Sequence, residues 1–346
     1  MPVLFLVSGV FDTLCTQHLV YLGASSMRSM FSIFGYYFAQ AIVGLSPIEF
    51  GDTPTNRKTS TDVEESHGLV DGEEVDTDAK LGFPEEENSH LVRYLYLASA
   101  ILDISGYVIR TIGMVYCGSG LFQVAFSSVA IFSAIYSRVI LKTFITPLQW
   151  FGIVVVTVGL VVSPFSSNTS GSSPITGILL TLLGAQFYAI SYIVNEYIIR
   201  VPGNKGSKEI CKQVGLINTF LCFIVICVDT IPNRDVLVYQ PIAVKKATVR
   251  KVFEAMGMYI ISHIIHSYAL YSIQGSLGAI WTGLLQCIRA CVVFLSSHYL
   301  YCSTDPNQCL TTSKIVSTIL VCVGIFIFTM GKQSIQSVSL SSESSQ

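Results

Sequence analysis

The sequence predicts an all-α membrane protein with about ten transmembrane helices, arranged as two inverted five-helix repeats. Three observations predict this fold: the composition, the recurrence of long apolar segments and a short repeat within the sequence. Of the 346 residues, 51% are hydrophobic and only 12% are charged, whereas about a quarter of the residues in a soluble domain are charged. The mean hydropathy is +0.60, so most of the surface is expected to face lipid.

The apolar segments recur at a length that suits a bilayer. About 20 mainly apolar residues are needed to cross the hydrocarbon layer as a helix. Only residues 117–119 separate the third segment from the fourth, and only residues 274–276 separate the eighth from the ninth, so each of these pairs is expected to be antiparallel. The expected spans are 2–20, 27–46, 91–115, 119–140, 147–165, 174–198, 213–231, 252–273, 277–300 and 314–331.

These spans divide the chain into two halves and two polar segments. Residues 1–165 form the first expected five-helix repeat, and residues 174–331 form the second. The acidic segment 46–90 has almost no aromatic residues to bury, so a disordered loop is expected. The Ser-rich segment 332–346 is expected to be a flexible tail.

A short internal repeat supports this division. Gly120-Leu121-Phe122-Gln123 in the fourth span recurs as Gly283-Leu284-Leu285-Gln286 in the ninth. Five helices per half is an odd number, so the two halves cross the membrane in opposite senses. Inverted repeats of this kind are typical of secondary transporters that bind their solute near the middle of the membrane.

Basic residues in the short loops set the expected orientation, because such loops stay on the cytosolic side. The basic residues in 138–142 and 200–212 are both cytosolic if the N-terminus is cytosolic. Asn168 then begins a lumenal Asn-Thr-Ser glycosylation acceptor. The basic residues in 234–251 disagree, because this orientation places them in the lumen.

Charged side chains within the spans are the candidate functional residues, since a charge inside a membrane is costly and usually faces a cavity or a partner. Residues spaced i, i+4 and i+7 share one side of a helix. Three polar stripes follow this spacing: Asp103, Tyr107 and Arg110; Gln123 and Ser127; and Thr282, Gln286 and Arg289.

Two interpretations of these charges stay open. In the functional one, Arg110 and Arg289 bind an anionic solute through forked hydrogen bonds, and Asp12, Asp103 or Glu196 handles a proton or the cationic end of the solute. In the structural one, the same residues form ion pairs, and for Glu196 a pair at the membrane edge is favoured. The candidate solute path is lined by Asp103, Arg110, Gln123, Gln286 and Arg289, with Asp12 and Glu196 as candidates for proton coupling.

Other motifs give weaker signals. His263 and His266 are spaced to bind a metal or relay protons, but no third ligand has matching spacing, so packing histidines are favoured and no metal or cofactor is expected. Cys302 and Cys309 bracket a polar segment, and a loop disulfide between them on an oxidising side stays open.

Several classes of protein are disfavoured. A net charge of −2 leaves no basic face for nucleic acid. The absence of a Walker loop, a hydrolase elbow or a metalloprotease motif argues against an ATP-driven pump and against an enzyme. The alternative to a transporter is a membrane scaffold or regulator that binds partners through the acidic loop 46–90. The expected partners are a small-molecule solute and the lipid bilayer, with a homodimer as a further candidate.

The sequence also resembles a known family, the drug/metabolite transporter superfamily with its EamA-like members, and within it the F-type branch of the solute carrier 35 proteins. The resemblance spans most helices but is specific over about a third of the chain. It is carried by Asp103-Ile104-Ser105-Gly106, Ser119-Gly120-Leu121-Phe122-Gln123, Ala130-Ile131-Phe132, Gln149-Trp150-Phe151-Gly152-Ile153, Gly159-Leu160-Val161-Val162, Ala185-Gln186 with Glu196, and Ile288-Arg289 with Val292-Val293.

The resemblance implies ten helices in two inverted repeats, cytosolic termini and alternating access in an endomembrane such as that of the Golgi, lysosome or vacuole. Substrates of such relatives range from nucleotide sugars to other organic solutes. The sequence departs from the branch at three places: Phe126 replaces an arginine of helix four, Gln286 replaces an aspartate before Arg289, and a Gly-Glu pair of helix two has no clear counterpart near Gly35-Tyr36.

Overall fold

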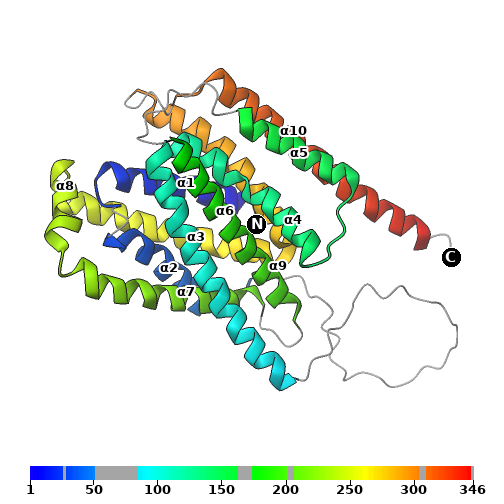
Figure 1. The fold of residues 1–346 in the computed structure, drawn as a ribbon, viewed down its shortest axis with the longest axis horizontal. Coiled ribbons are helices and arrows are strands. Elements are labelled where there is room, and N and C mark those ends of the chain that lie inside the picture. Colours follow the sequence, from blue (N-terminus) through cyan, green and yellow to red (C-terminus); the bar gives the residue numbers. More distant parts are fainter. Residues whose placement is uncertain (26–28, 51–84, 163–173, 202–205, 304–308, 344–346) are drawn as a thin grey trace.

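The computed structural model describes residues 1–346 except 26–28, 51–84, 163–173, 202–205, 304–308 and 344–346 (Figure 1). In the described residues every regular element is helical, which confirms the all-α prediction. The elements are α1 (Pro2–Tyr21), α2 (Phe31–Leu45), α3 (Glu85–Ser127), α4 (Val129–Val139), α5 (Pro147–Val162), α6 (Pro174–Arg200), α7 (Ser207–Val225), the π-helices η3 (Ile226–Thr230) and η4 (Asp235–Tyr239), α8 (Gln240–Val244), α9 (Val249–Tyr301) and α10 (Thr312–Glu343).

Within this described part, six helical segments are long and apolar enough to cross a membrane. They are Pro2–Tyr21, His90–Cys117, Ile175–Arg200, Ser207–Thr230, Val249–Leu300 and Thr312–Gly331, and the shorter apolar helices are Phe31–Leu45, Ala125–Val139, Pro147–Gly159 and Asp235–Val244. The chain is therefore an integral membrane protein. The count of ten spans and their inverted order stay predictions.

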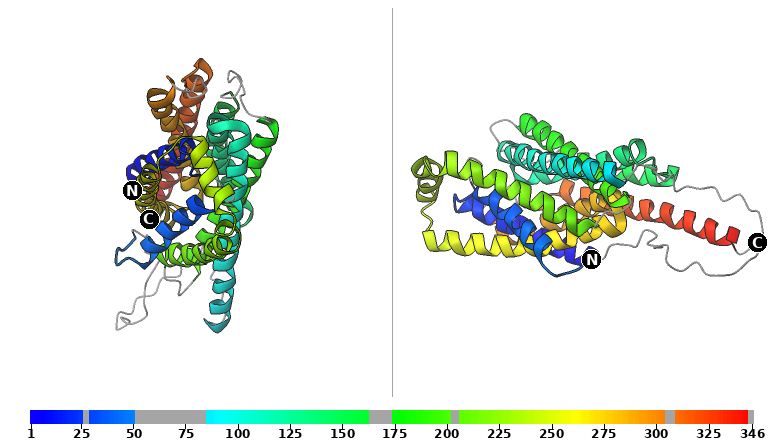
Figure 2. Two further views of the ribbon diagram at one scale, coloured as in Figure 1. Left: turned by 90° about the vertical axis from the view of Figure 1, so that its left-hand side faces the viewer. Right: turned by 90° about the horizontal axis from the view of Figure 1, so that it is seen from below.

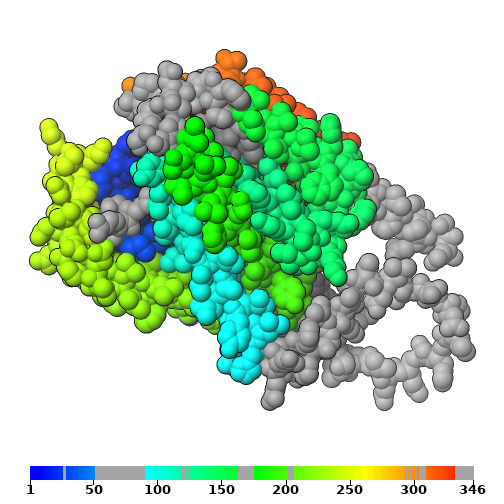
Figure 3. All heavy atoms as spheres, viewed as in Figure 1, coloured from blue at the N-terminus to red at the C-terminus, as the bar shows by residue number. Residues whose placement is uncertain are grey.

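The helices pack along their lengths in a bundle (Figure 2). The closest pairs are α3 with α6, α1 with α9, α2 with α7 and α5 with α10. Figure 3 shows α3 and α6 side by side on one face of the molecule. Large apolar side chains cover the outside of the helices, as expected of a surface that faces lipid, and include Val3, Val228 and Phe253, each more than 70% exposed.

The α5–α10 pair shows why close helix contacts need glycine. A Cβ atom added to Gly152 would lie 2.7 Å from the carbonyl oxygen of Gly324, and one added to Gly324 would lie 2.7 Å from the carbonyl oxygen of Gly152. The two backbones therefore touch where neither has a side chain. Small residues at such contacts allow tight packing inside a membrane, where the hydrophobic effect does not drive helices together.

The boundaries of two predicted spans differ from the structure. Residues 117–119 fall inside α3, and residues 274–276 fall inside α9. The break in α9 comes instead at Gly278, which has a φ of 82°. That backbone conformation costs glycine little and other residues more, and a carboxylate oxygen of Glu196 accepts a hydrogen bond from the Ala279 N–H at 2.7 Å. Glu196 thus caps the second part of α9.

The polar segments also contain more helix than expected. The helix α3 begins at Glu85, within the segment 46–90 that was predicted to be a disordered loop, of which residues 51–84 lie outside the described part. The helix α10 continues to Glu343 through most of the segment 332–346, which was predicted to be a flexible tail. Residues 332–343 contain no glycine or proline that would end the helix.

Candidate functional site

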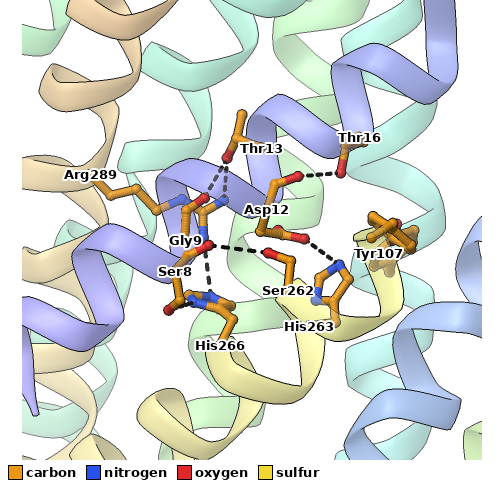
Figure 4. Close-up of polar contacts among 11 residues, drawn as sticks. Ser8, Gly9, Asp12, Thr13, Thr16, Tyr107, Ser262, His263, His266 and Arg289 are labelled. Carbon is orange, nitrogen blue, oxygen red and sulfur yellow. Dashed lines mark hydrogen bonds and ion pairs between the residues drawn. The ribbon is translucent and has the colours of Figure 1, made fainter. Parts of the chain in front are cut away.

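Asp12 of α1 and His263 of α9 form an ion pair in the middle of the bundle (Figure 4). The Oδ1 atom of Asp12 lies 2.6 Å from Nε2 of His263. The residues are 6% and 2% exposed, respectively. The ring of Tyr36 on α2 packs edge-on against the His263 ring, with the centroids 4.5 Å apart. A contact between a carboxylate and an imidazole thus joins the first helix of the chain to α9, among aromatic rings.

His266 and Arg289 form a second contact beside this pair (Figure 4). Arg289 Nη1 lies 3.3 Å from His266 Nε2, and Arg289 Nη2 donates a hydrogen bond to Thr13 Oγ1 at 3.1 Å. On its other side, His266 Nδ1 lies 3.2 Å from Ser8 Oγ. These partners of Arg289 are neutral groups. No ion pair in the described residues includes Arg289.

Gly9 provides the space that this arrangement needs. A Cβ atom at position 9 would lie 2.7 Å from Cδ of Arg289 and 2.9 Å from Cε1 of His266. Both distances are shorter than van der Waals contact, so a side chain would displace one of these residues. The glycine allows the arginine to cross α1 and reach Thr13.

Arg110 of α3 lies in a different environment, formed mainly by aromatic rings. Its guanidinium carbon is 4.4 Å from the centroid of the Tyr107 ring and 5.4 Å from that of Tyr188, and its Nε donates to the Tyr188 hydroxyl at 3.4 Å. The rings of Phe122 and Phe126 lie 5.8 and 5.2 Å from the guanidinium carbon. Ring faces attract cations, so these rings hold the guanidinium without neutralising its charge.

Asp103 lies on the same face of α3, about two turns before Arg110, and is hydrogen-bonded to a tyrosine. The Tyr37 hydroxyl of α2 donates a hydrogen bond to Asp103 Oδ2 at 2.8 Å, and Asp103 is 6% exposed. The ion pair between Asp103 and Arg110 that remained open from the sequence is not among the ion pairs of the described residues. Each charge of this stripe is satisfied by neutral aromatic residues.

Tyrosines connect the two groups of charges. The Tyr107 hydroxyl lies 3.2 Å from the Tyr259 hydroxyl, and the Tyr36 ring lies 5.0 Å from the Tyr107 ring. Tyr36 also contacts His263. The result is one polar and aromatic region, lined by α1, α2, α3, α6 and α9, that contains Asp12, Asp103, Arg110 and Arg289.

The other candidate residues are placed as follows. Gln286 is buried in α9, 6% exposed. Gln123 belongs to α3, but its side chain lies outside the described residues, as does Asn168 altogether. Glu196 pairs with Arg200, in addition to capping α9.

Two features lie outside this region. Cys302 and Cys309 are joined by a disulfide, so the loop bridge that the sequence left open is present in the structure. A cavity of about 380 Å³ lies at the ends of α2 and α7, lined by Gly44, Leu45, Ser46, Lys208, Glu209 and Lys212. Its lining contains none of the charged residues from the middle of the bundle.

Apart from Tyr107, the aromatic partners of the charges were missed from the sequence, as were Gly9 and Thr13. Tyr36, Tyr37 and Tyr188 have ordinary apolar neighbours in sequence, and no spacing rule marks them. Helical periodicity identifies residues that share one helix face, but these contacts join different helices. The sequence favours a packing role for His266, whereas the structure places its Nε2 against Arg289.

The fold and this region together define a class: a polytopic helical membrane protein with charges buried at its centre. Comparison with known proteins refines that class, because residues 80–164 match the EamA-like transporter family. The match extends from the segment before α3 to the end of α5 and includes Asp103 and Arg110. The predicted resemblance to the EamA-like drug/metabolite transporters is thereby confirmed.

Individual relatives agree with this match. The chain is 28% identical over 167 residues to solute carrier family 35 member F6 of Rattus norvegicus and to that of Mus musculus, which is 46% of this chain and 42% of each relative. It is 31% identical over 121 residues to an uncharacterized protein of Schizosaccharomyces pombe, 34% of this chain and 37% of the relative. The chain thus spans only about two fifths of the length of the curated relatives it matches. These matches confirm the resemblance to the F-type branch.

A solved crystal structure has a similar fold. It aligns with a TM-score of 0.56 over 96% of this chain and 96% of its own, at 12% sequence identity. At this low identity the likeness concerns the fold alone. It shows that almost the whole chain, rather than only the matched family region, follows an arrangement of helices found in another protein.

Proposed function

We propose that this protein is a secondary transporter, either a carrier or an antiporter, that moves a small organic anion across an endomembrane by alternating access. One observation carries the proposal: Arg110 and Arg289 lie in the middle of the bundle, their hydrogen bonds go to neutral groups, and no described ion pair includes either of them. A cation inside a membrane is costly unless something compensates it. A guanidinium also matches the forked geometry of a carboxylate or phosphate, so a bound anion would supply the missing charge.

The arrangement of helix contacts supports alternating access. In the proposed inverted repeat, α1, α2, residues 91–115 of α3, residues 119–127 of α3 together with α4, and α5 correspond in order to α6, α7, the first part of α9, the second part of α9, and α10. The contact between α3 and α6 then has its counterpart in the contact between the first part of α9 and α1, and both contacts are present. The pairs α2–α7 and α5–α10 join corresponding helices. Such symmetry lets one half move against the other around a central site.

The proposed endomembrane location agrees with the disulfide. In the expected orientation, with cytosolic termini, Cys302 and Cys309 lie on the lumenal side. Disulfides persist in oxidising compartments and are rare in the cytosol. The disulfide in the structure therefore supports both the orientation and a lumen on that side.

A thermal-shift screen of the purified full chain tests the anion site. Nucleotide sugars, amino acids, organic acids and vitamins are added one at a time, because a bound solute stabilises the state that binds it, by about 2.7 kcal/mol at 100 times Kd. We expect an anionic compound to raise the unfolding temperature. Flux of that compound into vesicles then measures transport.

Two substitutions make the screen specific. Arg289→Gln should abolish the stabilisation and the flux, whereas Arg138→Gln should keep both, because Arg138 is an exposed arginine near the end of α4. Unchanged flux in Arg289→Gln at normal protein amount would contradict the proposed site. Stabilisation by neutral or cationic compounds alone would contradict the proposed solute class.

A further inference from the structure

His266 has hydrogen-bond partners that fix its protonation state. A guanidinium can only donate hydrogen bonds, so His266 Nε2, which lies 3.3 Å from Arg289 Nη1, must accept one. The proton of the neutral ring is then on Nδ1, which faces Ser8 Oγ at 3.2 Å. The Ser8 hydroxyl donates in turn to the Phe5 carbonyl oxygen at 3.3 Å, so its oxygen is free to accept from His266. The contact of Nε2 with Arg289 therefore requires a neutral imidazole, and the contact of Nδ1 with Ser8 agrees with it.

We propose that His266 is the proton-coupling site of the carrier and that Arg289 controls it. This inference rests on the proposed function, in which an anionic solute binds Arg289. When the anion draws the guanidinium away, His266 Nε2 loses its donor and its lone pair is free. A proton from the aqueous side then forms an Nε2–H bond, so that one proton is carried with each anion. When the anion leaves, Arg289 returns to Nε2 and the proton is released to water.

The charges around His266 favour this order of events. A protonated His266 beside Arg289 would place two cations together, and like charges disfavour each other's charged forms. A bound anion removes that repulsion and therefore favours protonation. By linkage, the proton strengthens binding of the anion to the same extent. The coupling thus arises from one exchangeable hydrogen bond and the charge beside it.

The neighbouring ionisable groups contribute to the balance of charge. His263 is less suited to the exchange, because its Nε2 is held by Asp12 at 2.6 Å and Arg289 does not contact it. Asp12 provides a fixed negative charge close to both histidines. The other groups that face Arg289 are Tyr36 of α2, Arg110 of α3 and Tyr192 of α6. These groups are present whether or not a solute is bound. The Arg289 guanidinium is therefore the partner of His266 whose position changes when the solute binds.

The protonation state can be measured without a solute. The full chain, labelled with ¹⁵N in its histidines and placed in lipid nanodiscs, is titrated by NMR, and the His266 signal is assigned by its loss in His266→Gln. We expect a neutral ring with the proton on Nδ1 in the unsubstituted protein at pH 7. We also expect Arg289→Gln to raise the titration midpoint by about one pH unit or more, because it removes the positive charge beside His266. Arg138→Gln should leave the midpoint unchanged.

Two results would overturn the inference. One is a His266 that carries its proton on Nε2, or on both nitrogens, at pH 7 in the unsubstituted protein, for which His266→Gln serves only to assign the signal. The other is an equal midpoint with and without Arg289, with helix content by circular dichroism as the check on folding. Either result would leave the proposed anion transport untouched, because the measurement uses no solute. Conversely, loss of the transport proposal would leave the measured link between the two residues intact.

Discussion

The two groups of buried charges in this bundle are stabilised in opposite ways. Between α1 and α9, Asp12 pairs directly with His263, and Arg289 contacts His266 through hydrogen bonds. Between α2, α3 and α6, no described ion pair exists, and Arg110 lies among ring faces. In the first group, polar side chains are hydrogen-bond or ion-pair partners of one another, so removing one side chain leaves another buried group without its partner. The second depends on rings that remain well packed without the charge.

This difference predicts where substitutions destabilise the protein most. The largest effect is expected for Asp12→Ala, which removes one partner of a buried pair and leaves His263 without its acceptor. Breaking such a pair costs about 3 to 5 kcal/mol of unfolding free energy. Unfolding in sodium dodecyl sulfate, followed by circular dichroism, measures the loss.

The matched control is Glu254→Ala, whose pair with Arg250 is exposed. Loss of this pair should cost less than about 1 kcal/mol. Equal losses in the two variants would mean that the Asp12 pair stabilises no more than a surface pair.

Gly9→Ala tests whether the space around Arg289 is limiting. The added methyl would overlap Arg289 and His266, and overpacking of this kind costs about 1 to 3 kcal/mol. Gly257→Ala in α9 is the matched control, because no atom lies within 4 Å of its added methyl. That variant should be neutral or more stable, since glycine weakens a helix by about 0.5 to 1 kcal/mol relative to alanine. The same unfolding measurement compares the two, and an unaffected Gly9→Ala would show that the arginine has room to move.

Tyr37→Phe tests the hydrogen bond in the aromatic group. It removes the donor to Asp103 Oδ2 but keeps the ring, so the expected loss is the cost of one unsatisfied buried acceptor, about 1 to 3 kcal/mol. We place it toward the lower end, because the carboxylate can take up a proton and so lose its charge. Tyr299→Phe is the control, since Tyr299 is 89% exposed. If both variants unfold at the same concentration of dodecyl sulfate, the Tyr37 bond contributes nothing.

The same contrast explains which parts of the site the sequence could predict. The stripe of Asp103, Tyr107 and Arg110 follows from helical periodicity, and the structure places these residues in α3 as expected. The partners of these charges could not be predicted, because Tyr37 and Tyr188 come from other helices and their positions depend on packing. The bond between Arg289 and His266 was missed for a related reason: the two residues lie on opposite sides of the break in α9.

In the fold as well, features set by the local sequence could be predicted, whereas features set by contacts between helices could not. Apolar segment length predicted the apolar helices of the described chain, but not the helical residues at the start of α3 and at the end of α10. It misplaced the break in α9 at residues 274–276, since polarity marks Gln274 and Ser276 as a connection. The actual break at Gly278 is supported by Glu196 of α6, whose carboxylate caps the next helical residue. A contact between α6 and α9 therefore fixes the position at which α9 breaks.

Arg110→Leu should have the smallest effect on stability and the most informative effect on function. Taking a charge out of water costs several kcal/mol per ion, so a buried cation without an ion-pair partner adds little to stability, and no described ion pair includes Arg110. We expect the unfolding free energy to change by less than about 1 kcal/mol, because the rings of Tyr107, Phe126 and Tyr188 can pack against the leucine.

The binding of solute should nevertheless be lost in Arg110→Leu. Stabilisation by the anionic compound found in the thermal-shift screen measures this loss, with Arg138→Leu as the control that keeps it. A protein that retains its fold but loses its ligand would show that this charge is kept for binding, since it does nothing for stability. A large loss of stability in Arg110→Leu would mean instead that the cage depends on its cation, and that the two groups of charges are more alike than their contacts suggest.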